Sequence, residues 1–184
     1  YVIEDAAQSF GAEINGKKSC SIADISTTSF FPAKPLGCYG DGGALFTNNA
    51  DLAKAISEIG NHGQSKRYTH TRLGYNSRLD TLQAAILLEK LAIFPKEVEL
   101  RQQVAMRYDE HFRGKIKTTK VADGFKSVFA QYTIEVENRD EFLAKMKEDG
   151  IPTAVHYPVP IHHQPIFKDL GLGGIDMPLA DAAS

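Results

Sequence analysis

The chain has 184 residues, 42% of them apolar, and carries a formal net charge of -2 with a pI near 6.3. This length suits one domain or two small ones with a real core, and the charge gives no electrostatic basis for nucleic-acid binding. No apolar run approaches the roughly 18 residues of a membrane-spanning helix, there is no signal-peptide pattern, and the two cysteines make no disulfide framework. We therefore expect a cytoplasmic protein that binds neither nucleic acid nor membranes.

The first part of the chain predicts two strands and a short, stiff loop. Residues 2–5 end an apolar stretch with an acidic pair, and residues 24–31 have the composition of a buried strand. Pro32 and Pro35 bracket Lys34 and fix backbone φ, and glycines then turn the chain back. Lys34 is therefore expected at a strand end, at the edge where open α/β sheets bind ligands.

The rest of the chain alternates helical and strand patterns without an internal repeat. Pro95 is expected to end one helix and begin the next element, and the helix that follows repeats apolar residues every four positions. Gly60 and Gly150 are expected to end the helices before them. The expected helices lie at 50–59, at 79–94, from 98 onward and at 141–149, and the expected strands lie at 128–136 and 153–155.

Lys34 and Asp5 suggest a chemistry when they are considered together. An amine that forms a Schiff base needs desolvation or a cationic neighbour, and a pyridoxal cofactor needs a carboxylate at its ring nitrogen. Asp5 ends the first strand, so its side chain is expected to project from the same sheet edge as Lys34. The alternatives are that Lys34 is an ordinary surface lysine and that Asp5 caps a helix beginning at Ala6.

Three histidine and basic segments have structural alternatives. His62, between Asn61 and a glycine, is interpreted as part of a helix C-cap in preference to a site. His162 and His163 are not expected to bind zinc, because adjacent histidines point in different directions and no carboxylate or cysteine cluster accompanies them. The basic loop at 66–72 could approach a diphosphate or simply be solvated.

Several short motifs occur in one order along the chain. They are Val2-Ile-Glu-Asp-Ala-Ala-Gln-Ser9, Ser29-Phe-Phe-Pro-Ala-Lys34, Gly40-Asp-Gly-Gly-Ala44, His62-Gly63, Gly74-Tyr-Asn-Ser-Arg-Leu-Asp80 and His156-Tyr-Pro158. Together they resemble the DegT/DnrJ/EryC1/StrS family of sugar aminotransferases, which use pyridoxal 5'-phosphate to aminate nucleotide-linked keto-sugars. The resemblance implies an α/β protein of fold type I, like aspartate aminotransferase. Residues 1–95 would belong to the large cofactor-binding domain, and residues 96–184 to a small α+β domain.

The resemblance implies roles for five residues around the cofactor. Lys34 matches the lysine that binds the cofactor covalently and then moves the proton during transfer. Asp5 matches the carboxylate that pairs with the pyridinium nitrogen, and Gln8 matches the residue near the ring face and 3-hydroxyl. Ser29 matches a phosphate ligand, and Asn76 resembles a phosphate ligand that comes from the other subunit of a homodimer. Seen in isolation, Gln8 would suit a solvated helix position, Ser29 an ordinary strand hydroxyl and Asn76 a turn beside Gly74.

Arg78 carries the inference about the substrate. It precedes a broad apolar helix, and a guanidinium is a bidentate partner for carboxylates. Within the family the surrounding motif looks most like enzymes that act on a UDP-linked 3-keto hexuronic acid, in which the arginine pairs with the uronate. His156 and Tyr157 match a segment that reaches the sugar and nucleotide. The alternative for Arg78 is a structural contact with Asp80 or with a helix end.

The resemblance also implies the wider context. Glutamate would be the amino donor, the working enzyme would be a homodimer with shared active sites, and the product would serve surface polysaccharide, such as O-antigen lipopolysaccharide. Alternatives are a dTDP- or UDP-linked 4-keto sugar, a dehydratase of the same family, in which histidine replaces Lys34, or a non-catalytic assembly module. Both ends of the chain look cut relative to the family, so weak cofactor binding and little activity are expected of this chain alone.

Overall fold

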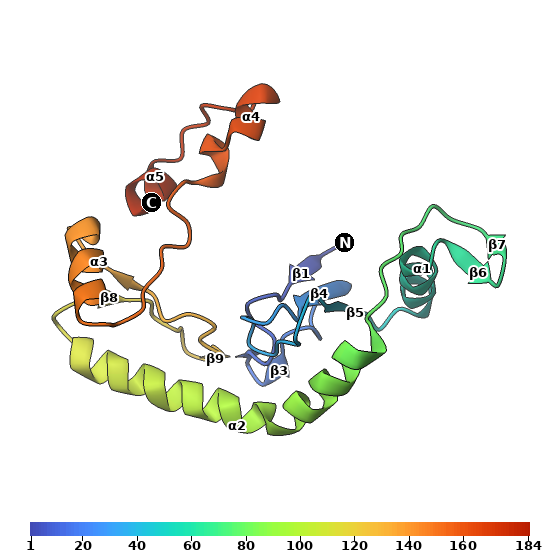
Figure 1. The fold of residues 1–184 in the computed structure, drawn as a ribbon, viewed down its shortest axis with the longest axis horizontal. Helices are drawn as coiled ribbons and strands as arrows, with labels where there is room; N and C mark the ends of the chain where they lie inside the picture. The colour runs from blue at the N-terminus through green and yellow to red at the C-terminus, as the bar shows by residue number, and fades with distance from the viewer. The chain divides into compact units, whose positions relative to one another are not determined.

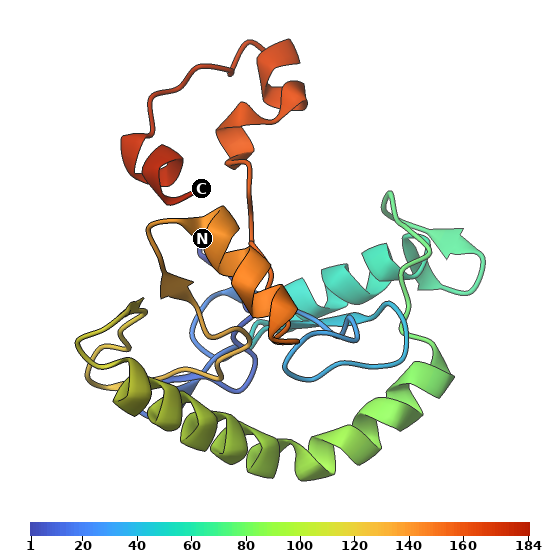
Figure 2. The same cartoon turned by 60° about the vertical axis from the view of Figure 1, so that its left-hand side comes forward.

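The computed structural model describes all 184 residues and divides them into two compact units, Tyr1–Glu135 and Val136–Ser184 (Figures 1 and 2). The domain boundary expected at residue 95 falls inside the long helix α2, Thr81–Phe112. None of the helices combines the length and the apolar character needed to cross a lipid bilayer.

A three-stranded sheet forms the centre of the first unit. Its strands are β1 (Ile3–Asp5), β4 (Ile25–Ser29) and β5 (Gly43–Phe46), in the order β1-β4-β5. β1 runs parallel to β4, and β5 runs antiparallel to it. Ser26 and Thr28 of β4 are buried, whereas Thr27 and Ser29 are only half-buried. The segment expected as a buried strand is therefore buried on one face and half-buried on the other.

The same unit contains smaller strand pairings, some local and some between distant parts of the chain. They are a sheet of β3 (Lys17–Lys18), β2 (Glu13–Ile14) and β9 (Phe125–Lys126), a hairpin of β6 (Gln64–Lys66) and β7 (Thr69–His70), and a pair of β8 (Lys117–Thr118) and β10 (Ile134–Glu135). The strand expected over 128–136 was too long. Only Ile134 and Glu135 pair with a neighbouring strand, and Phe129 interrupts the extended backbone with a φ of 46°.

Two helices accompany the sheet. α1 (Ala50–Gly60) confirms the expected helix and is capped by Asn49, whose Oδ1 accepts from the backbone N–H groups of Asp51 and Leu52. α2 continues through Pro95, so the expected break there was wrong. Figure 1 shows that α2 bends near its middle.

Packing in the core explains why α2 continues through Pro95, although a proline removes one helical hydrogen bond. Phe94 and Val98, on either side of Pro95, are both buried in the main apolar cluster. The ring of Phe94 lies 5.7 Å from the ring of Phe10, centre to centre, and Val128 is 1% exposed in the same cluster. Packing on both sides of the proline therefore offsets the lost hydrogen bond.

The second unit contains short helices and no strand. They are α3 (Arg139–Glu148), the 3-10 turn η1 (Ile161–His163), α4 (Pro165–Asp169) and α5 (Pro178–Ala183). α3 confirms the helix expected over 141–149. The strand expected over 153–155 is absent, because an extended segment becomes a strand only when another strand pairs with it.

The reasons given against a metal at the two histidines were wrong. Nε2 of His162 and Nε2 of His163 lie 2.9 and 2.7 Å from the same Oδ1 of Asp181, because α5 brings this carboxylate back to η1. The three ligand atoms lie within 4.8 Å of one another. An ionised carboxylate only accepts hydrogen bonds, so both rings donate, and His162 is buried in the process. These hydrogen bonds join η1 to α5. The absence of a metal at this position stays a prediction.

Candidate active site

The carboxyl ends of β1 and β4 bring three of the predicted site residues to one edge of the sheet. Asp5 ends β1 and pairs with Thr27, and Ser29 ends β4 two residues later. Because side chains alternate along a strand, Asp5, Thr27 and Ser29 share one face of the sheet. The loop that carries Lys34 begins directly after Ser29. The expected position of Lys34 beyond a strand end is therefore confirmed.

The lysine loop is held in a fixed shape by its own backbone and by a buried residue. The backbone N–H of Lys34 donates to the carbonyl of Phe31 at 2.9 Å, which closes a tight turn. A Cβ at Gly37 would lie 2.6 Å from the carbonyl oxygen of Pro32, so only glycine allows the chain to fold back here. Cys38 is fully buried and fastens the end of the loop. Lys34 itself is half-buried, and its Nζ makes no hydrogen bond or ion pair within the chain.

Asp5 and Ser29 have bonding capacity left over. Oδ1 of Asp5 accepts from the backbone N–H of Ala7 at 3.0 Å, which closes a turn rather than the helix considered from the sequence, and its other oxygen has no partner in the chain. Oγ of Ser29 accepts from the N–H of Phe31 at 3.2 Å, so its own proton is free to be donated. Gln8 is exposed nearby, and its amide makes no hydrogen bond within the chain.

Glu4 lies on the opposite face of the sheet and was given no role from the sequence. Its carboxylate accepts from Oγ of Ser26 at 2.8 Å, from Oγ of Ser19 at 2.9 Å and from the backbone N–H of Cys20. Burial alone would raise the pKa of Glu4, but these hydrogen bonds outweigh it and lower the pKa below its ordinary value. Glu4 thus fixes β1 against β4 and holds Asp5 in register. The alternation of side chains along β1 was the signal that could have separated the two acids.

Asn76 and Arg78 lie in a second segment, which is joined to the end of α1. Asn76 is exposed and forms an isolated β-bridge with Asn61, the C-cap residue of α1. Nη1 of Arg78 donates to Oδ1 of Asn61 at 3.0 Å and lies 2.9 Å from Nε2 of His62. Arg78 makes no ion pair with Asp80, so of the structural alternatives only a contact with a helix end is present, and that helix is α1.

His62 has the backbone role expected from the sequence. It follows the C-cap of α1 with a φ of 60°, and the N–H of the next residue, Gly63, donates to the carbonyl of Glu58 at 2.7 Å. The contact of its ring with Arg78 was not foreseen. The two residues are 16 positions apart, and no local pattern connects them.

The start of α2 lies against the lysine loop. The side-chain carbonyl of Gln83 accepts from the backbone N–H of Tyr39 at 2.8 Å, and a Cβ at Gly42 would lie 3.0 Å from Leu79. The segment that holds Asn76 and Arg78 leads directly into this contact. Neither residue, however, contacts Asp5 or Lys34 through a hydrogen bond or ion pair within the chain.

His156 and Tyr157 belong to the second unit. Both side chains are exposed, and their rings pack edge to face with centres 5.5 Å apart. The predicted site residues thus lie in three places: the sheet edge, the segment before α2, and an exposed loop of the second unit.

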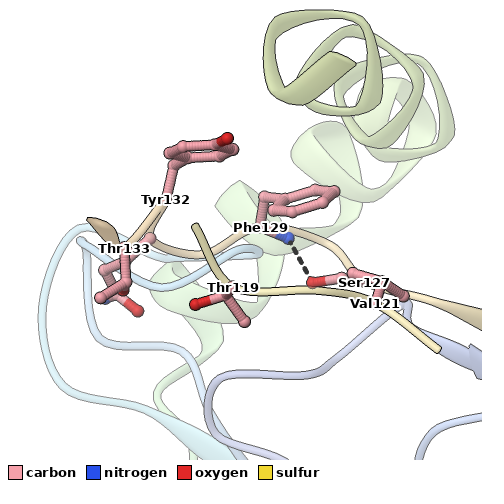
Figure 3. Close-up of a pocket in the computed structure, with 7 residues that line it drawn as sticks. Thr119, Val121, Ser127, Phe129, Tyr132 and Thr133 are labelled. Carbon is pink, nitrogen blue, oxygen red and sulfur yellow. Dashed lines mark hydrogen bonds between the residues drawn. The ribbon is translucent and has the colours of Figure 1, made fainter. Parts of the chain in front are cut away.

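The two clearest pockets of the structure lie away from these residues. One, of about 100 Å³, is lined by residues between Thr119 and Thr133 (Figure 3). Tyr132 is one of these lining residues, and its phenol donates to Asp109 at 2.6 Å. The other, of about 440 Å³, is mostly apolar and lies on the Glu4 face of the sheet. Neither pocket is lined by a predicted site residue.

A comparison with known protein families shows to which family the chain belongs. The model of the DegT/DnrJ/EryC1/StrS aminotransferase family matches residues 1–184. The chain belongs to this family. In this chain Asp5 and the loop that carries Lys34, both singled out by the motif comparison, lie at one edge of the sheet.

Two curated relatives show how similar other members are. A UDP-2-acetamido-2-deoxy-3-oxo-D-glucuronate aminotransferase of Pseudomonas aeruginosa is 57% identical over 91% of the chain, which covers 47% of that protein. A UDP-N-acetyl-3-dehydro-alpha-D-glucosamine 3-aminotransferase of Acidithiobacillus ferrooxidans is 41% identical over 90% of the chain and 45% of that protein. The chain spans about half the length of the curated relatives it matches.

Solved structures confirm the α/β fold. A DegT/DnrJ/EryC1/StrS aminotransferase from Brucella abortus is 43% identical and superposes with a TM-score of 0.94 over 100% of this chain and 49% of that one. NtdA from Bacillus subtilis, described with bound cofactor PMP, is 31% identical with a TM-score of 0.86 over 99% of this chain and 43% of that one. The arrangement of strands and helices described above is therefore the family's own.

Proposed function

We propose that the protein is a pyridoxal-phosphate-dependent aminotransferase that moves an amino group from glutamate to a UDP-linked 3-keto hexuronic acid. The observation that carries the proposal is the grouping at one sheet edge of an unpartnered amine, a carboxylate with a free oxygen and a hydroxyl with a free proton. These groups belong to Lys34, Asp5 and Ser29.

These residues fit the cofactor group by group. Pyridoxal phosphate presents an aldehyde, a ring nitrogen and a phosphate, and it supplies an electron sink for a carbanion at the carbon that carries the amino group. Lys34 would hold the aldehyde carbon, the free oxygen of Asp5 would hold the ring nitrogen, and Ser29 and Asn76 would hold the phosphate. Gln8 would lie near the ring face and 3-hydroxyl.

Each residue of the edge has a task that its environment permits. The Nζ of Lys34 has no competing partner, so it can accept a proton from the carbon that loses the amino group and deliver one to the carbon that gains it. The carboxylate of Asp5 would favour the protonated form of a ring nitrogen placed beside it, because an opposite charge stabilises the charged form. The Ser29 hydroxyl adds a neutral donor for phosphate.

The substrate is inferred from Arg78 and from the similarity to the Pseudomonas aeruginosa aminotransferase. Arg78 would pair with the uronate, and His156 and Tyr157 would reach the sugar and nucleotide. Asn76 and Arg78 have no contact with Lys34 in their own chain, which supports their use by a second copy in a homodimer. The product would be a UDP-linked amino sugar made in the cytoplasm for surface polysaccharide, such as O-antigen lipopolysaccharide.

The test is a panel of keto-sugars given to the full-length protein with glutamate. We expect turnover of a UDP-linked 3-keto hexuronic acid and much weaker turnover of UDP- or dTDP-linked 4-keto sugars. Lys34→Ala should abolish turnover, and Lys54→Ala, at an exposed position of α1, should leave it unchanged. Preferred turnover of a 4-keto sugar would replace the substrate assignment, and full activity of Lys34→Ala would refute the mechanism. If no sugar is aminated by the wild-type protein, the non-catalytic alternative gains.

A further inference from the structure

The guanidinium of Arg78 is attached to the protein through only one of its nitrogens. Nη1 donates to Oδ1 of Asn61 at 3.0 Å and contacts Nε2 of His62 at 2.9 Å. An arginine cannot give up its charge, so Nε2 of His62 must be the acceptor, and that ring is neutral with its proton on Nδ1. Nη1 carries two hydrogens, and both are used.

Both acceptors are held by the backbone around the end of α1. Asn61 donates its N–H to the carbonyl of Glu58 at 3.1 Å, and the N–H of His62 donates to the carbonyl of Tyr75 at 2.8 Å. The carbonyl of His62 in turn accepts from Nδ1 of His70 at 2.8 Å. These hydrogen bonds fix Asn61 and His62, and the two residues in turn hold the Arg78 side chain in one orientation.

The same loop is fastened from its other side by an ion pair. Nε of Arg72 donates to the buried carboxylate of Glu58 at 2.7 Å. Glu58 is thereby neutralised by Arg72 and is not a partner for Arg78. The acidic residue nearest to Arg78 in sequence, Asp80, makes no ion pair with it.

Two consequences follow for what Arg78 can bind. With Nη1 used, the guanidinium keeps one complete two-donor edge, Nε with Nη2, and a planar carboxylate fits such an edge with two parallel hydrogen bonds. Both of its partners are neutral, so its positive charge is not cancelled inside the chain. The side chain is therefore oriented without being neutralised, which suits an anion from outside.

We propose that Asn61 and His62 are positioning residues that direct the Nε–Nη2 edge of Arg78 toward the carboxylate of an acidic sugar nucleotide. This rests on the proposed function, in which Arg78 reads a uronate. Their contribution is to selectivity for the carboxylate, not to the affinity for the nucleotide.

The experiment measures binding by calorimetry, without turnover, using UDP-glucuronic acid and UDP-glucose as probes of the full-length protein. The ratio of the two affinities reports the carboxylate contact. We expect the wild-type protein to prefer UDP-glucuronic acid and Arg78→Ala to lose the preference. Asn61→Leu and His62→Leu should each reduce the preference by about three- to tenfold, the effect of one charge-assisted hydrogen bond at a partly exposed site, with unchanged affinity for UDP-glucose.

A matched pair at His62 separates orientation from folding. At the positive φ of His62, leucine and glutamine cause the same backbone strain, but only glutamine keeps a side-chain hydrogen-bond acceptor. His62→Gln should therefore restore much of the preference that His62→Leu loses. In the Arg78→Ala background, His62→Leu should have no further effect on the ratio.

Each other outcome overturns the proposal in a distinguishable way. If His62→Leu and Asn61→Leu keep the wild-type preference while Arg78→Ala loses it, the positioning role fails and the proposed substrate stands. If both probes weaken equally in the leucine variants, the residues act only on folding. If the wild-type protein shows no preference for the carboxylate, the positioning role and the uronate assignment fail together, whereas the aminotransferase assignment is judged by the sugar panel.

Discussion

Replacing Gly74 with alanine should detach the segment that contains Asn76 and Arg78 from the end of α1. A Cβ at Gly74 would lie 2.0 Å from the backbone nitrogen of Gly63 and 2.7 Å from the carbonyl oxygen of Ile59, and neither backbone atom can move independently. The backbone segments 59–63 and 74–77 must therefore separate. Separation breaks three backbone hydrogen bonds, His62 to Tyr75 at 2.8 Å, Tyr75 to Ile59 at 2.8 Å and Ser77 to Gly60 at 2.9 Å.

The size of the effect follows from those bonds. Each contributes about 0.5–1.5 kcal/mol net, so the three together stabilise the closed segment by about 1.5–4.5 kcal/mol. Amide hydrogen exchange in peptides covering 59–63 and 74–78 should accelerate by about 10- to 1,600-fold in Gly74→Ala, at about tenfold per 1.4 kcal/mol. Gly114→Ala is the control, because a Cβ there meets nothing within 4 Å despite a φ of +71°. Wild-type exchange rates at His62, Tyr75 and Ser77 in Gly74→Ala would refute the reasoning.

Two further predictions concern side chains that join separate elements of the fold. The pKa of Glu4 is lowered in the folded chain, so its contribution to stability is present above the ordinary value of 4.5 and is lost as the pH falls below it. The stability difference between the wild-type chain and Glu4→Gln, from urea unfolding, should shrink below that pH, and a constant difference would contradict this. In the second unit, His162→Ala should increase exchange in residues 161–183 more than His163→Ala, because only His162 is buried in the contact with Asp181. Equal effects would show that burial does not matter there.

The sheet edge could be predicted because its signals are local. Asp5 and Ser29 each end a strand pattern, and prolines and glycines fix the loop around Lys34, so strand polarity alone brings these residues together. The helix break at Pro95 was wrong, because the packing of Phe94 in the core, against Phe10, outweighs the lost hydrogen bond, and only the fold shows that packing.

Contacts between distant parts of the chain could not be predicted. The alternation in 128–136 is compatible with a long strand, but only two of its residues find a partner strand. The ring of His62 meets Arg78, and Asp181 meets His162, through turns whose geometry depends on the surrounding backbone. The same limit explains why the sequence argument about neighbouring histidines failed.

The most direct test of the account is to locate the cofactor covalently. The full-length protein, incubated with pyridoxal 5'-phosphate, is reduced with borohydride, digested and mapped by mass spectrometry, beside a Lys34→Arg variant. We predict one cofactor-derived mass increment, on the peptide that contains Lys34, and its loss in the variant. A label on another lysine, or sugar amination by a protein that carries no label, would contradict the central role assigned to Lys34.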